Sequence, residues 1–218
     1  MRISRLLLTL TIMLCCFFVS TARSIELQEQ GMWSAKAINI HPLPSGLEKG
    51  HVSSPDKKFV LEVQDAILKV QSGKQQSAPA EIYLDGIAEI GWAANSEAIF
   101  ITRSDGGWVG SWYTRVVFLG KETLSELDVT KQALENYEKN VSKCPEEVPN
   151  VAAIGWIDGT KTLLIVVSTP NHSSCPDMGN FEGYLVTVPS GDIKRRYGEA
   201  ELQKEFKQLI GKRLSAEQ

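Results

Sequence analysis

Ser54-Pro55-Asp56-Lys57-Lys58 opens the first of three segments that share one plan. In each segment a polar turn with Asp or Asn leads into a strand-like run, a loop and a second strand-like run, and then Gly precedes a charged residue. The first segment has its runs at 59–63 and 67–70 and ends at Gly73-Lys74. Asp, Asn and Pro favour the tight turn that starts a strand, and β-branched and aromatic residues favour the strand itself. The plan therefore predicts a pair of antiparallel strands in each segment.

The plan returns twice further along the chain. In the second copy the turn contains Gly91-Trp92 and Asn95, and the strand-like runs are 99–102 and 115–119. In the third copy the turn contains Gly155-Trp156 and Asp158, and the runs are 163–167 and 184–188. Further strand candidates lie between the segments, at 81–84, 87–90 and 151–154. A repeated unit of this kind is typical of folds in which similar small sheets pack against one another. The sequence predicts a mainly β fold.

The turn at 54–58, with the Trp-led turns at Trp92 and Trp156, resembles the W-S-P-D-G-K-x-I-x-F pattern of TolB-like and related WD-type β-propeller repeats. The resemblance covers roughly residues 52–193. Three departures stand against the pattern: Ser53 replaces the Trp, Ala93-Ala94-Asn95 replaces Ser-Pro-Asp, and the third unit is one residue short. The resemblance implies four-stranded blades around an axis, usually at least four of them.

About three blade units are present, so the expected fold is a partial β-propeller-like repeat, with a β-sandwich as the alternative. Three blades leave open sheet edges, and native proteins cover or pair such edges. We therefore expect either a strand from Glu26 to Ile40 that completes a sheet or a homodimer through the open edges.

Two helices interrupt the β pattern. One is expected from Leu124 or Asp128 to Asn140, inserted between the second and third units, with Ser125 or Asp128 as its N-cap. The other is expected from Glu199 to Lys212 at the C-terminal end. It is amphipathic, because the following side chains recur at helical spacing: Leu202, Phe206, Leu209 and Ile210.

The first 24 residues are typical of a secretory signal peptide. Arg2 and Arg5 precede an uncharged run at 6–19, and Ala22-Arg23-Ser24 provides small residues at the cleavage site. We expect residues 25–218 to form a single β-rich domain in the periplasm or outside the cell, without a transmembrane segment after cleavage. The formal net charge of −3 offers no basic surface for nucleic acid.

Of the four cysteines, two leave with the signal peptide and Cys144 and Cys175 remain. An even pair in an oxidising compartment predicts a disulfide. Such a bond would join the segment after the inserted helix to the loop of the third unit, and it would stabilise the fold by roughly 3–4 kcal/mol.

The loops inside the units are expected to emerge on one side of the molecule, which we call the loop rim: 103–113 and 169–181. Loops on a rigid scaffold often bind ligands, and aromatic and Arg side chains are common at binding hot spots. The candidate binding residues are Arg103, Asp105, Trp108, Trp112, Tyr113 and His172. The alternative for the first loop is a hairpin whose Trp side chains cover the core.

The sequence contains none of the common motifs of nucleophilic, phosphate-binding, zinc or calcium sites. We expect no cofactor and no metal, and a non-enzymatic module that binds a protein or a glycan. The alternative is a cell-envelope hydrolase whose active site has no sequence motif, for example with Asp105 and either Asp177 or Glu182 as a carboxylate pair. A third possibility is an assembly subunit whose C-terminal apolar stripe is buried against another chain.

Overall fold

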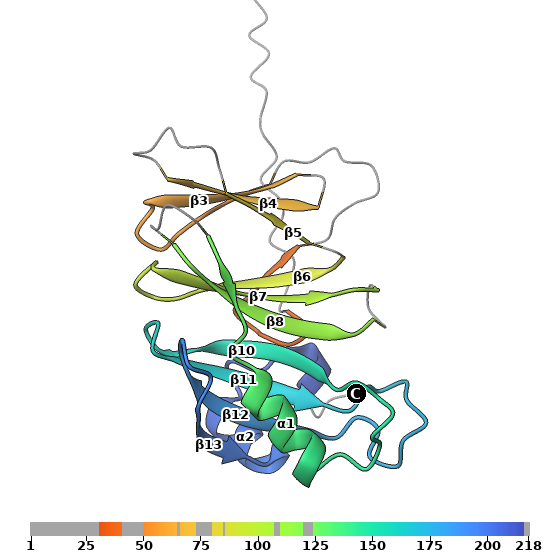
Figure 1. Cartoon of the computed structure of the whole chain (residues 1–218). Helices are drawn as coiled ribbons and strands as arrows, with labels where there is room; N and C mark the ends of the chain where they lie inside the picture. Colours follow the sequence, from red (N-terminus) through yellow and green to blue (C-terminus); the bar gives the residue numbers. More distant parts are fainter. Residues whose placement is uncertain are drawn as a thin grey trace, which may run out of the picture.

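The computed structural model describes residues 31–40, 50–64, 66–72, 80–84, 86–106, 110–119 and 124–215. The expected signal peptide at 1–24 lies outside these residues. Within them the chain folds into three antiparallel sheets, stacked one upon the next (Figure 1), and none of the three closes into a barrel. A mainly β fold of three units is therefore confirmed, and the stack of open sheets is consistent with a partial propeller-like or a sandwich-like arrangement.

Each sheet contains the two strands predicted from one unit. The first sheet has the order β2 (Gly50–Ser53), β3 (Phe59–Gln64), β4 (Ile67–Ser72) and β5 (Ala80–Tyr83). The second has the order β1 (Ile38–Ile40), β6 (Ala88–Trp92), β7 (Ala98–Ser104), β8 (Trp112–Phe118) and β9 (Glu126–Leu127). The third has the order β10 (Asn150–Asp158), β11 (Thr162–Ser168), β12 (Phe181–Thr187) and β13 (Ile193–Tyr197).

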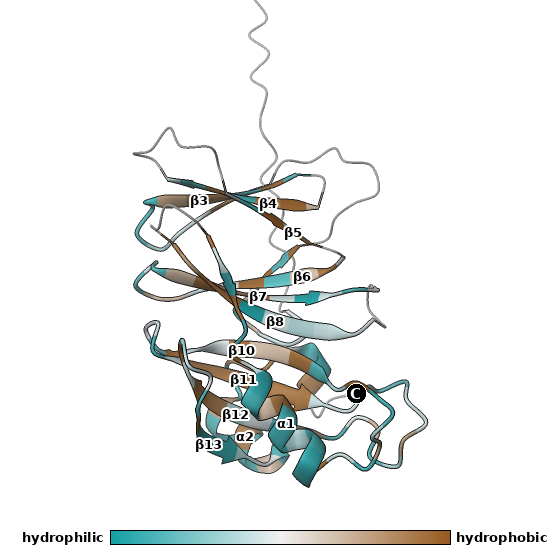
Figure 2. Cartoon of the chain, viewed as in Figure 1, coloured by the Kyte–Doolittle hydropathy of each residue, from teal (hydrophilic) through white to brown (hydrophobic). Residues whose placement is uncertain are grey.

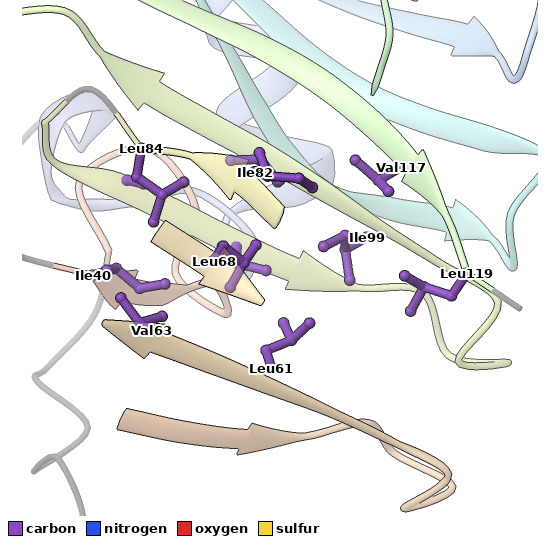
Figure 3. Close-up of a cluster of buried hydrophobic side chains, with 12 residues drawn as sticks. Ile40, Leu61, Val63, Leu68, Ile82, Leu84, Ile99, Val117 and Leu119 are labelled. Atoms are coloured by element: carbon purple, nitrogen blue, oxygen red, sulfur yellow. The ribbon is translucent and has the colours of Figure 1, made fainter. Parts of the chain in front are cut away.

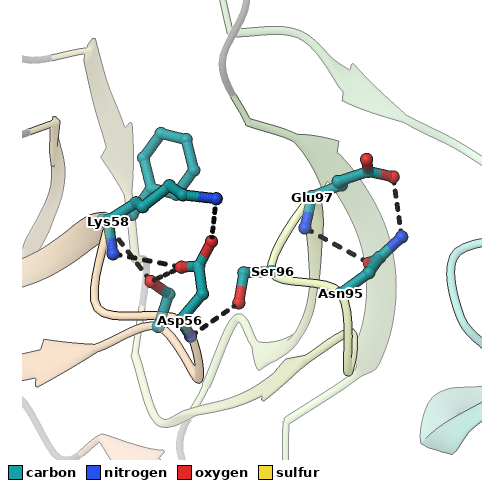
Figure 4. Close-up of polar contacts among 7 residues, drawn as sticks. Asp56, Lys58, Asn95, Ser96 and Glu97 are labelled. Carbon is teal, nitrogen blue, oxygen red and sulfur yellow. Dashed lines mark hydrogen bonds and ion pairs between the residues drawn. The ribbon is translucent and has the colours of Figure 1, made fainter.

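The polar turns that start the units lie on one side of the stack, as Figure 1 shows for the hairpins before β3, β7 and β11. In the first turn, Asp56 accepts a hydrogen bond from Ser54 Oγ and forms an ion pair with Lys58 at 2.8 Å. The Lys58 ammonium and the Ser54 hydroxyl hold the pKa of Asp56 well below its usual range. The next turn is tied to the first, because Asp56 N–H donates to Ser96 Oγ at 3.0 Å (Figure 4). In the second turn Asn95 Oδ1 accepts a hydrogen bond from Glu97 N–H. Asp56 and Asn95 therefore build turns, as the sequence indicated.

The first two sheets share an apolar core. It is made of inward-facing residues of β1 and of β3 to β8 and of the residues next to them. Figure 3 labels nine of these side chains: Ile40, Leu61, Val63, Leu68, Ile82, Leu84, Ile99, Val117 and Leu119. Alternation along each strand places these side chains between the two sheets. The alternate residues of β7 and β8, such as Phe100 and Val116, face the third sheet instead.

The second and third sheets are joined by polar as well as apolar contacts. The hydroxyls of Thr102 and Thr114 lie 2.8 Å apart, and both accept a hydrogen bond from the N–H of Ala153. Trp156 Nε1 donates to Gly91 O at 3.1 Å. Because these groups are buried or half-buried, the bonds fix how β10 lies across the second sheet.

The N-terminal strand is shorter than the expected range of Glu26–Ile40. Residues Ile38–Ile40 pair with β6 and form the edge strand of the second sheet on that side. Residues 26–30 lie outside the described part of the chain. The prediction that a segment before the repeats covers an open edge is confirmed for β6.

Residues 31–35 and 209–213 run beside each other and form what we call the terminal clasp. Gly211 N–H donates to Trp33 O, and Ala35 N–H donates to Leu209 O. The Glu89 carboxylate, on β6, accepts hydrogen bonds from the backbone N–H groups of Met32, Trp33 and Ser34. Burial raises the pKa of Glu89. The clasp therefore ties both ends of the described chain to the second sheet through one buried carboxyl group.

The inserted helix, α1 (Lys131–Asn140), begins later than predicted, with Thr130 in the N-cap position. Residues 126–127 form β9 instead, because they pair with Val116 and Val117 of β8. The Asp128 carboxylate accepts hydrogen bonds from Thr130 N–H and Oγ1, so neither Ser125 nor Asp128 is the N-cap. In Figure 2 the visible side of α1 is largely hydrophilic, while its buried residues Ala133 and Tyr137 pack against apolar side chains of β11 and β12.

The C-terminal helix, α2 (Glu199–Phe206), ends earlier than the predicted Lys212 and is followed by a short 3-10 helix at Lys212–Leu214. Helix geometry stops there because Leu209 and Ile210 enter the terminal clasp. The predicted apolar stripe packs on the third sheet of the same chain, among a cluster that includes Leu164, Val166 and Tyr197. The stripe is therefore covered within the chain.

Candidate binding surface

Trp112 is not on an exposed rim. Its side chain is 1% exposed and its ring packs edge-on against Trp33, with the ring centres 5.8 Å apart. Its backbone N–H donates to Asn150 Oδ1 at 3.1 Å. The prediction of Trp112 as an exposed binding residue is wrong, since the side chain covers the core, as in the alternative for this loop. Trp108 lies outside the described residues.

Arg103 is held by three groups of its own chain. Its guanidinium forms an ion pair with Glu126 at 2.8 Å, donates to Tyr83 O, and lies 4.9 Å from the centre of the Tyr113 ring. Its side chain is 11% exposed. In this arrangement Arg103 connects β5, β8 and β9.

Tyr113 and Asp105 also make contacts within the second sheet. The Tyr113 ring lies against a second guanidinium, that of Arg115, at 5.7 Å. Asp105 is exposed, and its carboxylate accepts a hydrogen bond from Ser111 N–H at 2.8 Å. Asp105 therefore closes the β7–β8 loop. The structure brings Arg103 and Tyr113 together, but as a packed pair.

The disulfide predicted between Cys144 and Cys175 is confirmed, with the two Cα atoms 5.6 Å apart. It joins the segment after α1 to the loop between β11 and β12. Lys143 N–H, next to the first cysteine, donates to Asp177 Oδ2 at 2.9 Å. A covalent bond and a buried carboxylate therefore hold the same two segments together.

A buried hydroxyl network lies under this loop. Tyr137 Oη, from α1, is 2.9 Å from Thr169 Oγ1 and donates to Asn180 O at 2.9 Å. Thr169 Oγ1 donates to Asp177 Oδ2 at 3.1 Å. Burial raises the pKa of Tyr137, so its hydroxyl remains a hydrogen-bond donor at neutral pH. The network fixes both ends of the loop to α1.

Residues 142–148 and 171–179 together form what we call the strapped surface. It presents two large apolar side chains to solvent, Val148 at 65% exposure and Met178 at 51%. His172 is exposed in the same loop, whereas Ser173 and Asp177 are buried. Sequence reasoning placed His172 here but missed Val148 and Met178. Their positions within a few residues of Cys144 and Cys175 were the available signal.

The three candidate carboxylates belong to separate groups of contacts. Glu182 forms an ion pair with Arg196 at 3.1 Å and accepts a hydrogen bond from Tyr184 Oη, whose pKa is raised by burial. Asp177 is bound by Thr169 and Lys143, and Asp105 by Ser111, as described above. Each carboxylate therefore has a structural partner of its own.

No cluster of three or more metal-binding side chains occurs in the part of the chain that the structure describes. Over the same ranges, each helix falls short of the length and apolar character that crossing a bilayer requires.

Comparisons with known proteins give one structural similarity. A solved structure assigned as TolB from Agrobacterium tumefaciens is similar to 78% of this chain at 17% sequence identity and a TM-score of 0.38. The chain spans 56% of the length of that protein. No protein-family model matches the chain, and no curated protein matches it. A similarity this distant carries no argument about function, which must be argued from the residues of this chain.

Proposed function

We propose that the protein is an exported, non-enzymatic module that binds another protein through the strapped surface. The observation that carries the proposal is that Val148 and Met178 stand exposed on two segments held by one disulfide. Single exposed apolar side chains scattered over a surface are common and need no explanation. Exposed apolar side chains that lie together on an ordered loop are typical of a contact surface.

The order of the loop supports binding, because a fixed loop loses little conformational entropy when a partner docks. The disulfide, the Lys143–Asp177 hydrogen bond and the Tyr137–Thr169 pair all restrict the loop before any contact forms. Met is also adaptable in shape, and it is frequent on surfaces that accept other proteins.

A protein fits this surface better than a glycan does. Glycans are usually bound on flat aromatic rings, and the ring of Tyr113 already lies against Arg103 and Arg115. The two large apolar side chains that the strapped surface exposes, Val148 and Met178, are an aliphatic and a thioether group, which favour an apolar patch on a partner protein. The disulfide is consistent with an oxidising compartment outside the cytosol.

The test is capture of a stoichiometric protein from an envelope extract by residues 25–218, with the Val148→Lys, Met178→Lys double variant as the comparison. We expect the double variant to lose capture at least tenfold while its melting temperature stays unchanged. Tyr83→Lys is the matched control, because Tyr83 is as exposed as Val148 but lies in the first sheet. Capture that survives in the double variant, or that Tyr83→Lys abolishes equally, would rule out this surface.

A further inference from the structure

One edge of the first sheet is open. Among the described residues, no strand lies on the far side of β2. In the second sheet the corresponding side of β6 is taken by β1, which pairs along Ile38–Ile40. The two sheets are built on the same plan, so the open edge of β2 in the first sheet corresponds to the edge of β6 that pairs with β1 in the second sheet.

At two residues of the open edge, the main-chain groups have no partner among the residues that the structure describes. Ser54 N–H donates to Phe59 O at 2.9 Å, which identifies a hydrogen-bonded pair in the ladder with β3. Such pairs alternate along antiparallel strands, so Val52 and Gly50 also bond to β3, opposite Leu61 and Val63. The N–H and C=O groups of His51 and Ser53 therefore point away from β3.

We propose that β2 pairs with β2 of a second copy of this chain, antiparallel and with Val52 on the twofold axis. In this register His51 faces Ser53 of the other copy, and Ser53 faces His51. Both members of each pair have outward main-chain groups, so the two pairs form four hydrogen bonds without any shift. Only a register centred on Val52 lets the outward N–H and C=O groups of both His51 and Ser53 form hydrogen bonds across the contact.

The side chains agree with the same register. Val52 faces the core of the first two sheets and packs against it, whereas His51 and Ser53 are exposed on the opposite face. Pairing places Val52 beside Val52 of the second copy on the apolar side, and polar residues beside polar residues on the other side. An unrelated extended peptide could bond to the same edge, but β2 itself already has the alternation that the edge requires.

The contact is short, because β2 has four residues. Four hydrogen bonds and one apolar pair must offset the entropy of association, so the dimer is expected to form only at high protein concentration. Sedimentation of residues 25–218 over a hundredfold range of concentration should show a monomer that becomes a dimer. A monomer throughout that range would overturn the proposal.

Cysteine cross-linking tests the register. A pair that is not hydrogen-bonded has its Cα atoms about 4.5 Å apart, within the range of a disulfide. Val52→Cys should therefore give an intermolecular disulfide under mild oxidation, several times faster than His51→Cys. In the proposed register the two copies of residue 51 lie about 8 Å apart or more, beyond disulfide reach. Equal cross-linking of the two variants would indicate random collision and overturn the pairing.

A proline variant tests the main-chain bonds. Ser53→Pro removes an N–H that points outward and leaves the hydrogen bonds between β2 and β3 in place. The dimer should be lost while the melting temperature of the monomer changes little. A dimer that persists in this variant overturns the proposal, and the Val52→Cys result remains decisive should the proline variant fail to fold. This test does not involve the strapped surface, so it is independent of the proposed function.

Discussion

The first and third sheets follow the same sequence plan but end the stack in different ways. The outer face of the first sheet is polar, with neighbouring strands placing His51, Glu62, Lys69 and Glu81 side by side. Lys69 and Glu81 form an ion pair at 3.2 Å across this face. In the third sheet every residue of β11 is buried, because α1 covers part of one face and α2 covers the other.

The difference shows that a repeat can be terminated by its own side chains or by an added helix. A polar outer face lets the first sheet meet water directly, as terminal repeats do in stacked proteins. The third sheet has an apolar outer face and depends on α2 and the terminal clasp to cover it. The two ends should therefore differ in how they unfold.

The largest expected effect on stability comes from truncating one buried leucine in the first sheet and one in the third. Leu164 and Leu68 are both fully buried, so either change to Ala should cost about 2–5 kcal/mol. We expect Leu164→Ala to lower the free energy of global unfolding, measured with denaturant. Leu68→Ala should mainly speed hydrogen exchange in β3 and β4, since the first sheet has only one covered face. If Leu68→Ala accelerated exchange in β11 equally, the sheets would be a single cooperative unit and the comparison would fail.

Removal of the disulfide should destabilise the region of the third sheet and leave the first sheet unchanged. The Cys144→Ser, Cys175→Ser double variant is expected to lose roughly 2–4 kcal/mol, because the unfolded chain is no longer constrained. Hydrogen exchange should rise at the end of α1 and in the β11–β12 loop and stay the same in the first sheet. Wild-type protein with reductant is the control and should match the variant. Unchanged stability would mean that the hydrogen bonds of Tyr137 and Asp177 hold the loop without the disulfide.

The smallest effect concerns the dependence of stability on pH. Burial raises the pKa of Glu89 above its ordinary value of 4.5, so the native state binds a proton where the unfolded chain has lost it. Stability should therefore fall as pH rises from 4.5 through the raised pKa, by up to about 1.4 kcal/mol per pH unit.

Denaturant titrations from acidic to neutral pH test this, with Glu89→Gln as the variant that cannot titrate. The variant should lack the slope. In wild-type protein the protection of amides from exchange, relative to their intrinsic rates at each pH, should change with pH in the terminal clasp and not in the first sheet. A slope that persists in Glu89→Gln would assign the effect to another group.

The repeated plan predicted the paired strands of all three sheets because it depends on local turn chemistry. Asp56 and Asn95 act in their own hairpins, so their roles can be deduced from a few neighbouring residues. The disulfide was predictable for a different reason, since only two of the four cysteines lie outside the predicted signal peptide.

The errors came from contacts between distant segments. Trp112 resembled an exposed loop residue because nothing near it in sequence indicates that Trp33 packs against it. Residues 126–127 are compatible with a helix, but pairing with β8 makes them a strand. Val148 and Met178 were overlooked because exposure depends on how the loop is strapped, which the sequence does not show.

The terminal clasp has a consequence for the order of folding. Ser34 and Ile210 pair although nearly the whole chain lies between them. Contacts of such high sequence separation slow folding, since a long loop must close before they form. The ribosome delivers residues 209–213 long after residues 31–35, so the hydrogen bonds between the two segments can form only once residue 213 has left the ribosome. A chain truncated before residue 209 should therefore be recognisable to proteases by residues 31–35, which lack their hydrogen bonds to 209–213.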